Sequence, residues 1–357
     1  RYGRRQRQMC IRDSLASADK EKIDLLIFSE MFLSGYPPED LVMRDDFLDE
    51  ITKSIVHLTN LTKKTSLVFG APIKKDGFLY NAAICASEGN LLETYFKQIL
   101  PNYKEFDEKR YFEKGNKNKI FKIKDIPIGL SICEDIWSET FVNNLVDEGA
   151  EIILNLSASP FTISKKETRK KMLSSYYEKY QRPIVYVNQT GGQDELVFDG
   201  SSLILGSSKK SLVELKSFEI DSLNFEYRDS KINFLDSCPS NDKNHLKDIY
   251  EALVLGTKDY VEKNNFKGVL IGSSGGIDSA LTAAIAHDAL GKGRVKTIMM
   301  PFDFTADISI EDAGLLAKNL GIDHSEISIK EMFKSFSLAL KDSFEGMGID
   351  KTEENLQ

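Results

Sequence analysis

Three residues in the first half of the chain carry the side chains that amide hydrolysis needs. Glu30, Lys97 and Cys133 each come at the end of a short apolar segment, at residues 25–28, 91–96 and 128–132. In an α/β protein the ends of strands present side chains to a cleft. A thiolate is a good nucleophile, a nearby ammonium lowers the thiol pKa and stabilises an oxyanion, and a carboxylate carries protons. We therefore expect the three side chains to converge on one site.

A glycine- and serine-rich turn in the last third of the chain indicates a second kind of chemistry. An apolar run at residues 269–271 leads into this turn, and a helix-like run of small residues follows at 280–286. Glycines let backbone N–H groups converge on an anion, and a helix N-terminus adds a favourable dipole. We expect the turn to bind the phosphates of ATP through Gly272, Ser273, Ser274, Gly275, Gly276, Ile277, Asp278 and Ser279.

Asp278 distinguishes this turn from a Walker A loop, which ends in Gly-Lys-Ser/Thr. A bare carboxylate would repel a phosphate, so we expect Mg²⁺ to bridge the two, with Asp278 as its ligand. The string Ser-Gly-Gly-Ile-Asp-Ser at residues 274–279 resembles the signature loop of the N-type ATP pyrophosphatases. That resemblance implies an enzyme that cleaves ATP to AMP and pyrophosphate while adenylating a substrate. The plainer alternative is a tight turn in an ordinary α/β domain.

Taken singly, Glu30, Lys97 and Cys133 also have plainer interpretations, as two solvated charges and a small core residue. The strings around them, however, resemble the glutamate, lysine and cysteine motifs of the nitrilase-like glutaminase domain. Matching strings lie in order at residues 29–41, 97–108, 132–137, 155–161 and 186–200. The resemblance implies Glu30 as proton acceptor, Lys97 as the lysine beside the oxyanion and Cys133 as nucleophile.

The two sets of motifs together resemble the layout of the glutamine-dependent NAD(+) synthetases. Within that family, Tyr103, Ser159 and Lys165 match positions that hold glutamine, and Tyr36 is a further candidate. The resemblance implies that L-glutamine is hydrolysed to supply ammonia, and that ATP adenylates deamido-NAD so that ammonia converts it to NAD. The enzyme would then be a ligase that forms C–N bonds and uses Mg²⁺.

Two other interpretations remain open for this chain. One is a different glutamine-dependent ATP-pyrophosphatase amidotransferase, such as a GMP-synthetase-like enzyme, although those pair the loop with another type of glutaminase. The other is a truncated fragment that retains at most glutaminase activity. Residues 302–306 also depart from the family, which usually has a serine, a tyrosine and small hydroxyl residues there.

The family's synthetase domain continues beyond the position of Gln357 and carries there a second metal-binding acid. We therefore expect that this chain does not itself form NAD and that it retains at most glutaminase activity.

The order of the motifs predicts an α/β chain with two domains. The resemblance implies a nitrilase-like α-β-β-α sandwich at residues 15–235, a linker at 236–245, and the N-terminal part of an NAD synthetase (ATP pyrophosphatase) domain at 246–357. The second domain should be a partial Rossmann-like, adenine nucleotide α-hydrolase-like parallel α/β domain. Residues 1–14 are rich in arginine and lack regular periodicity, so we interpret them as a non-native leader that replaces a first strand.

Composition narrows the class of protein. The net charge of −8 over 357 residues argues against a nucleic-acid surface. No apolar run approaches the ~18 residues that suggest a membrane span. The four cysteines are widely spaced, which excludes an obvious zinc site or disulfide framework and favours the cytoplasm. Small-molecule substrates are thus expected as partners, and a homo-oligomer is expected for the full-length form.

Overall fold

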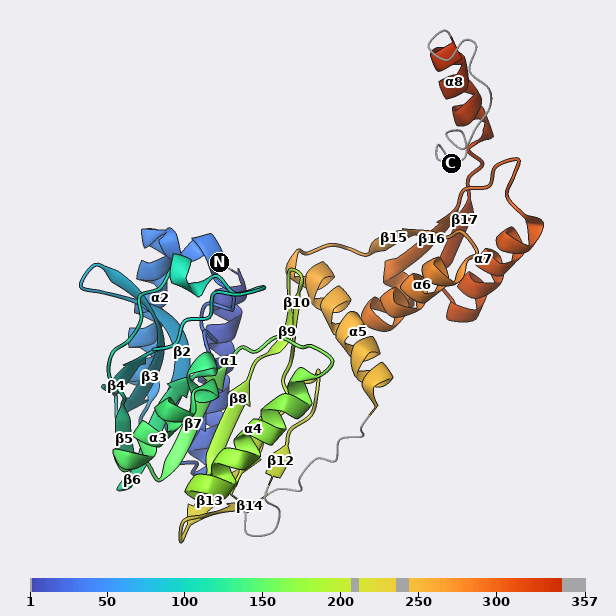
Figure 1. The fold of residues 1–357 in the computed structure, drawn as a ribbon. Coiled ribbons are helices and arrows are strands. Elements are labelled where there is room, and N and C mark those ends of the chain that lie inside the picture. Colours follow the sequence, from blue (N-terminus) through green and yellow to red (C-terminus); the bar gives the residue numbers. More distant parts are fainter. Residues whose placement is uncertain (1, 207–211, 236–243, 342–357) are drawn as a thin grey trace. The chain divides into compact units, whose positions relative to one another are not determined.

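The computed structural model describes residues 2–206, 212–235 and 244–341 (Figure 1). They form two compact units that divide between Ala252 and Leu253, and each unit is described by itself. The linker expected at residues 236–245 lies outside the described residues except for its last two positions. Among the helices of the described ranges, none is both long and apolar enough to cross a membrane.

The first sheet of unit one contains four strands. In spatial order they are β1 (Leu25–Ile27), β2 (Ser66–Lys75), β3 (Phe78–Ser87) and β4 (Asn90–Phe96). β1 pairs in parallel with β2, whereas the other pairs are antiparallel. Helices α1 (Tyr2–Glu21) and α2 (Asp45–Leu61) pack against one face of this sheet. The contact is a buried cluster that includes Ile11 of α1, Ile51 and Leu58 of α2, and Leu67 and Phe69 of β2.

The second sheet of unit one contains six strands. In spatial order they are β12 (Leu212–Glu214), β11 (Leu203–Leu205), β8 (Ile184–Asn188), β7 (Ile152–Ser157), β6 (Ile126–Ile132) and β5 (Ile120–Ile123). The central strands β6, β7 and β8 are parallel and almost wholly apolar, as expected for strands buried on both faces. Helices α3 (Glu139–Asp147) and α4 (Lys165–Tyr180) cover its outer face.

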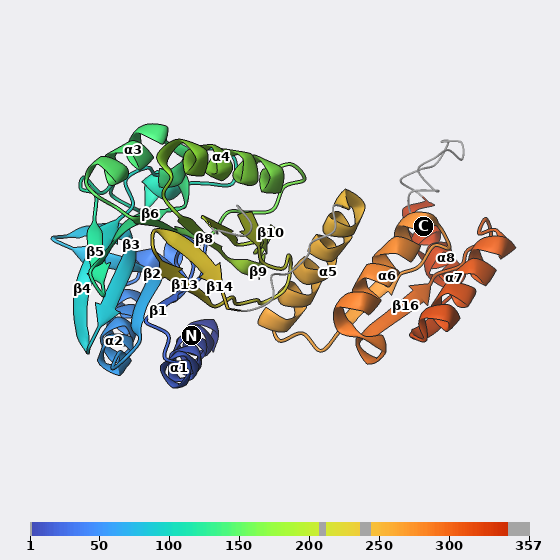
Figure 2. The same cartoon turned by 90° about the horizontal axis from the view of Figure 1, so that it is seen from below.

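The two sheets stack face to face with helices outside, as Figure 2 shows. One buried cluster joins them, with Val68 and Tyr95 from the first sheet and Leu130, Ile132 and Leu154 from the second. The predicted nitrilase-like α-β-β-α sandwich is therefore confirmed. Its topology brings the carboxyl ends of β1, β4, β6 and β7 into one region, where the predicted catalytic residues follow their strands.

One part of unit one differs from the sequence interpretation. Residues 2–14 belong to helix α1, although the sequence predicted no regular structure there, and Ile11 is fully buried against the first sheet. The buried face of α1 continues one turn later with Leu15, so its periodicity is not visible within residues 2–14 alone. After β11, unit one continues with β12 and a separate hairpin, β13 (Phe225–Arg228) and β14 (Lys231–Phe234), all within residues 15–235.

Unit two is built on a parallel sheet of three strands, which confirms its predicted class. The strands are β15 (Val269–Gly272), β16 (Val295–Met299) and β17 (Asp323–Glu326). Helices α6 (Ile277–Leu290) and α7 (Asp307–Leu320) pack on this sheet through small residues, among them Ala283, Ala286 and Ala317. The remaining helices are α5 (His245–Lys263), which crosses the division between the units, and α8 (Lys330–Leu340).

Candidate active sites

Glu30 lies in a tight turn after β1 and is fully buried. The turn runs so close to β2 that a Cβ atom at Gly70 would lie 2.3 Å from the backbone nitrogen of Met31. Gly70 also donates its N–H to the carbonyl of Ser29 over 3.1 Å and accepts the N–H of Leu33 over 3.2 Å. Because glycine has no side chain, the turn can lie against the strand and hold the Glu30 carboxylate in the interior.

Lys97 follows β4, and its buried ammonium lies between two carboxylates. Nζ donates to Oε1 of Glu30 and to Oε1 of Glu108, each over 2.7 Å. Glu30 also accepts the side-chain amide of Asn81 at 2.7 Å and the backbone N–H of Ala158 at 2.8 Å. Burial lowers the pKa of Lys97, but the charges of Glu108 and Glu30 outweigh it and hold that pKa well above its usual value. Lys97 is therefore a permanent ammonium.

Cys133 follows β6 and begins the short 3-10 helix η3 (Cys133–Trp137). Its φ of +41° is rare for a residue with a side chain, and such outliers cluster at active sites. Burial raises the pKa of the thiol well above its ordinary value, Glu30 raises it further, and Lys97 lowers it. The sequence predicted a lowered pKa from Lys97. Its charge acts in that direction, but burial and the carboxylates prevail because the site is closed to water.

The structure thus brings the three predicted residues together: Lys97 contacts Glu30, and Cys133 lies within the electrostatic reach of both. Glu108 is a fourth member that sequence reasoning missed. It is buried at the start of η2 (Glu108–Arg110), and burial raises its pKa to about 7. It closes the lysine-motif string at 97–108, but no strand end or spacing rule drew attention to it.

The four predicted glutamine-binding residues lie around this cluster at different depths. Tyr36 is buried, and its hydroxyl donates to Oε1 of Glu108 over 2.8 Å. Ser159 is buried just after the end of β7. Tyr103 is 45% exposed. Lys165, the first residue of α4, stacks its ammonium over Trp137 with 4.7 Å from Nζ to the ring centre.

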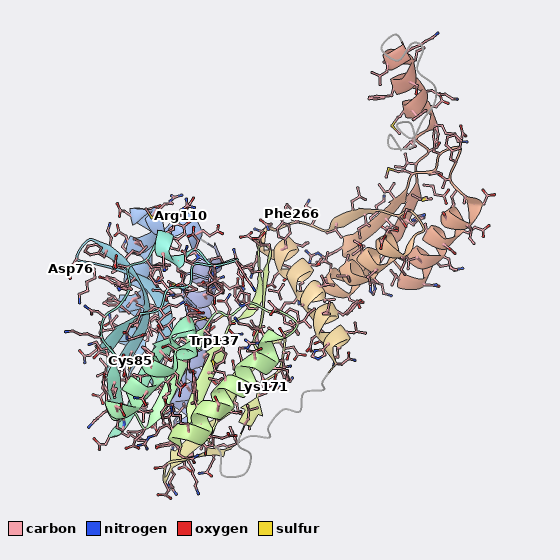
Figure 3. The ribbon with its side chains drawn as sticks, viewed as in Figure 1. Asp76, Cys85, Arg110, Trp137, Lys171 and Phe266 are labelled. Atoms are coloured by element: carbon pink, nitrogen blue, oxygen red, sulfur yellow. The ribbon has the colours of Figure 1, made fainter. Side chains whose placement is uncertain are left out.

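Two of these positions have charged or aromatic neighbours on the nucleophile helix η3. The hydroxyl of Tyr103 lies 3.0 Å from each carboxylate oxygen of Glu134, the residue after Cys133. Trp137, labelled in Figure 3, ends the same helix. An ammonium, a carboxylate and a phenol therefore lie on or against the helix that begins with Cys133, and Glu134 is a second residue that the sequence did not single out.

The predicted phosphate loop joins β15 to α6 in unit two. The N–H of Ser273 donates to the carbonyl of Ile298 over 2.8 Å, and its hydroxyl is buried with no partner among the described residues. Ser279 Oγ donates to the carbonyl of Gly276 at 3.0 Å and lies 3.2 Å from Ser274 Oγ. Gly276 caps the N-terminus of α6. The turn is thus a compact hydroxyl-lined loop at a helix N-terminus, as the sequence predicted.

Asp278 and Gly275 are the two residues of this loop whose surroundings bear on phosphate and metal binding. Asp278 lies in the first turn of α6. Gly275 has a φ of +77°, and a Cβ there would lie 2.2 Å from the carbonyl oxygen of Ser309. In the described part of the chain, no group of three His, Cys, Asp or Glu side chains could hold a metal ion alone. A magnesium ion at Asp278 would take water molecules and phosphate oxygens among its further ligands.

Family comparisons match the two units to two known families. Residues 9–223 match the carbon-nitrogen hydrolase family, and residues 249–357 match NAD synthase. The chain belongs to the carbon-nitrogen hydrolase family through its first unit. Along nearly its whole length it is similar to glutamine-dependent NAD(+) synthetases, which confirms the resemblance that the motifs predicted.

Two such relatives illustrate the extent of the match. The glutamine-dependent NAD(+) synthetase of Acinetobacter baylyi is 39% identical over 95% of this chain, and that of Thermotoga maritima is 39% identical over 97%. The chain spans 63% and 66% of the lengths of these two proteins.

Solved structures give the same result. A glutamine-dependent NAD+ synthetase from Acinetobacter baumannii, in complex with ADP, has a TM-score of 0.93 and 37% identity, covering 99% of this chain and 67% of that one. An amidase of the nitrilase superfamily from Nesterenkonia has a TM-score of 0.54 and 22% identity, covering 60% of this chain and 81% of that one. The second likeness concerns the fold alone.

Proposed function

We propose that unit one hydrolyses the side-chain amide of L-glutamine, and that the synthetase domain to which unit two belongs uses the released ammonia to amidate deamido-NAD to NAD. The observation that carries this proposal is the buried cluster of Lys97 between Glu30 and Glu108, whose charges act on the buried thiol of Cys133. A buried ammonium and two carboxylates beside a thiol are costly to maintain, and active sites are where such groups occur.

The chemistry follows from the protonation states of the cluster. Because Cys133 rests as a thiol, Glu30 takes its proton as the sulfur attacks the amide carbon. The charge of Lys97 stabilises the negative oxygen that forms. Glu30 then returns the proton to the leaving nitrogen, and ammonia departs from a thioester. Water, deprotonated by Glu30, attacks the thioester, which releases glutamate and regenerates Cys133.

Glutamine recognition is assigned to the charged groups beside η3. The ammonium of Lys165 suits the α-carboxylate of the substrate, and the carboxylate of Glu134, held by Tyr103, suits its α-ammonium. Ser159 would contact the buried end of the substrate. Tyr36 is better assigned to Glu108, because its hydroxyl is already used there. Recognition of both α-groups would distinguish glutamine from simple amides.

Unit two is proposed to bind ATP at the loop between β15 and α6 and to cleave it to AMP and pyrophosphate. Support comes from the loop's place at a helix N-terminus and from the unpartnered buried hydroxyl of Ser273. Asp278 would hold Mg²⁺ together with phosphate oxygens, and the ion would supply charge neutralisation at the phosphates. Adenylation would activate the carboxylate of deamido-NAD for attack by ammonia. We place this chemistry in the cytoplasm; a homo-oligomer stays a prediction.

The test is glutamine hydrolysis by the purified chain, followed as glutamate and ammonia release. Cys133→Ala should abolish release, while Cys85→Ala serves as the matched control, because Cys85 is a buried thiol within the first sheet (Figure 3). Both variants should retain the far-ultraviolet circular dichroism of the parent. Equal activity in the parent and the Cys133 variant would refute the proposal.

A further inference from the structure

Asp135 is a fully buried carboxylate that the proposed reaction steps do not use. It lies within η3, two residues after Cys133. It forms no ion pair with any of the described residues, and a buried carboxylate without one requires several hydrogen-bond donors to be tolerated.

The structure supplies four such donors. Oδ1 of Asp135 accepts the backbone N–H groups of Gln98 at 3.1 Å and Ile99 at 2.8 Å. Oδ2 accepts the hydroxyl of Tyr95 at 2.7 Å and the backbone N–H of Ile132 at 2.9 Å. Burial raises the pKa of Tyr95 well above its usual value, so this hydroxyl stays protonated.

These donors come from both sheets of the sandwich. Tyr95 belongs to β4 of the first sheet, and the two amides belong to the turn that directly follows Lys97. The fourth donor belongs to β6 of the second sheet and directly precedes Cys133. One carboxylate thus connects the end of the lysine strand to the end of the cysteine strand.

We propose that Asp135 is a positioning residue that sets the separation between the Lys97 ammonium and the Cys133 sulfur during glutamine hydrolysis. The inference rests on the proposed function of unit one. Apolar packing between the two sheets is not directional, whereas four hydrogen bonds to one planar group fix both distance and orientation. A displacement of about 1 Å between reacting groups lowers a rate by about 100-fold.

The amide of an asparagine would break this connection at a defined point. A carboxylate only accepts hydrogen bonds, whereas an asparagine carries one accepting and one donating end. In Asp135→Asn the NH₂ group would turn toward Tyr95, whose hydroxyl can rotate to accept it. The oxygen would keep Gln98 and Ile99, and the N–H of Ile132 would face a donor. The hydrogen bond between residue 135 and Ile132 of β6 is therefore the one that this substitution removes.

The experiment measures kcat and KM for glutamine hydrolysis at pH 8. Burial raises the pKa of Asp135 to about 6, so its carboxylate is ionised at that pH. Asp135→Asn should lower kcat about 10- to 100-fold while KM stays within about threefold, because the groups that bind glutamine are elsewhere. Tyr95→Phe removes one donor and should lower kcat by about two- to tenfold in the same way.

Glu214→Gln provides the control for a general loss of stability. Glu214 is a buried carboxylate paired with Lys166 and Lys170 on the outer side of the second sheet. Its variant should have a lowered melting temperature and a kcat within about twofold of the parent.

Three results would overturn the inference: a folded Asp135→Asn variant with a kcat within about twofold of the parent, a change confined to KM, or an equal fall in kcat for Glu214→Gln. If Asp135→Asn does not fold, Tyr95→Phe decides, and an unchanged kcat there overturns the inference. Cys133→Ala is run in the same assay. Glutamine hydrolysis by Cys133→Ala would contradict the proposed function. If Cys133→Ala is inactive but Asp135→Asn is fully active, only the positioning role of Asp135 is contradicted.

Discussion

Lys97 and Glu108 are joined by a buried hydrogen bond of 2.7 Å, and the oxygen that accepts it also accepts the hydroxyl of Tyr36. The second oxygen of Glu108 is buried with no partner among the described residues. Glu30 bonds to the same ammonium. One positive charge therefore serves two carboxylates, and this imbalance explains why burial and the charge of Glu30 raise the pKa of Glu108 to about 7. A proton on the unpartnered oxygen relieves the repulsion.

A pH-dependent stability follows from Glu108. The unfolded side chain titrates at its ordinary 4.5, whereas the folded one titrates at about 7. Between these values the folded state binds more protons, so its free energy of unfolding falls as pH rises through the window. The Glu108→Gln variant cannot titrate at this position. Relative to that variant, the free energy of unfolding of the parent should fall by about 2–3 kcal/mol between pH 4.5 and pH 7.

Urea unfolding at several pH values measures this difference. The comparison with Glu108→Gln cancels the other titrating groups, since they are common to both proteins. If the free energy of unfolding depends on pH in the same way for parent and variant between pH 4.5 and pH 7, Glu108 is already ionised at low pH, contrary to the expectation.

A substitution at Gly70 should disturb catalysis without touching any catalytic side chain. A methyl group there would overlap the backbone of Met31 and Glu30, because it would lie 2.3 Å from the former and 2.7 Å from the latter. The Glu30 turn would have to move, and Gly70→Ala should lower kcat for glutamine hydrolysis by about 100-fold. Gly77→Ala is the control, since Gly77 has a φ of +83° but open space around its Cβ position. Equal kcat values for Gly70→Ala and Gly77→Ala would contradict the prediction, since the Glu30 turn would then tolerate the displacement.

The sequence predicted the elements that carry the cluster because each strand has a distinctive apolar run before a polar residue. Glu30, Lys97 and Cys133 follow β1, β4 and β6 as expected. The residues that the sequence did not predict are recognisable only by contacts between segments that are distant along the chain. Glu108 is recognisable only by its contact with Lys97, and Asp135 only by donors from both sheets. Neither contact has a fixed spacing along the chain.

The raised pKa of Cys133 was also beyond sequence reasoning, for a related reason. An adjacent ammonium predicts a lowered thiol pKa, but the net shift depends on burial and on how many carboxylates share the site. Helix α1 is a comparable case, since burial of Ile11 stabilises a segment whose own pattern is weak. Packing and charge balance, not local pattern, decide these features.

Substitutions of the neighbouring residues Lys165 and Lys166 should have different effects, on substrate binding for Lys165 and on stability for Lys166. Lys165 lies over Trp137, whereas Lys166 pairs with Glu214 at 2.9 Å. Lys165→Met should raise KM for glutamine about tenfold or more with a smaller change in kcat, because a partner for the α-carboxylate is lost. Lys166→Met carries the same change of charge and should leave KM within about twofold. A higher KM in both variants would indicate a general charge effect on the substrate.

The phosphate loop of unit two offers a matched pair of glycines for testing ATP binding. Gly275 and Gly291 have nearly equal φ values, +77° and +78°, so alanine is strained by the backbone at either position. Only at Gly275 would the added Cβ meet another segment, 2.2 Å from the carbonyl oxygen of Ser309, whereas nothing lies within 4 Å at Gly291. Gly275→Ala should therefore displace the loop and weaken Mg²⁺–ATP binding by at least about tenfold in titration calorimetry, while Gly291→Ala should only lower stability, by about 1 kcal/mol. Glutamine hydrolysis should persist in both variants, since the loop belongs to the other unit. Unchanged ATP affinity in a folded Gly275→Ala protein would exclude this loop as the nucleotide site.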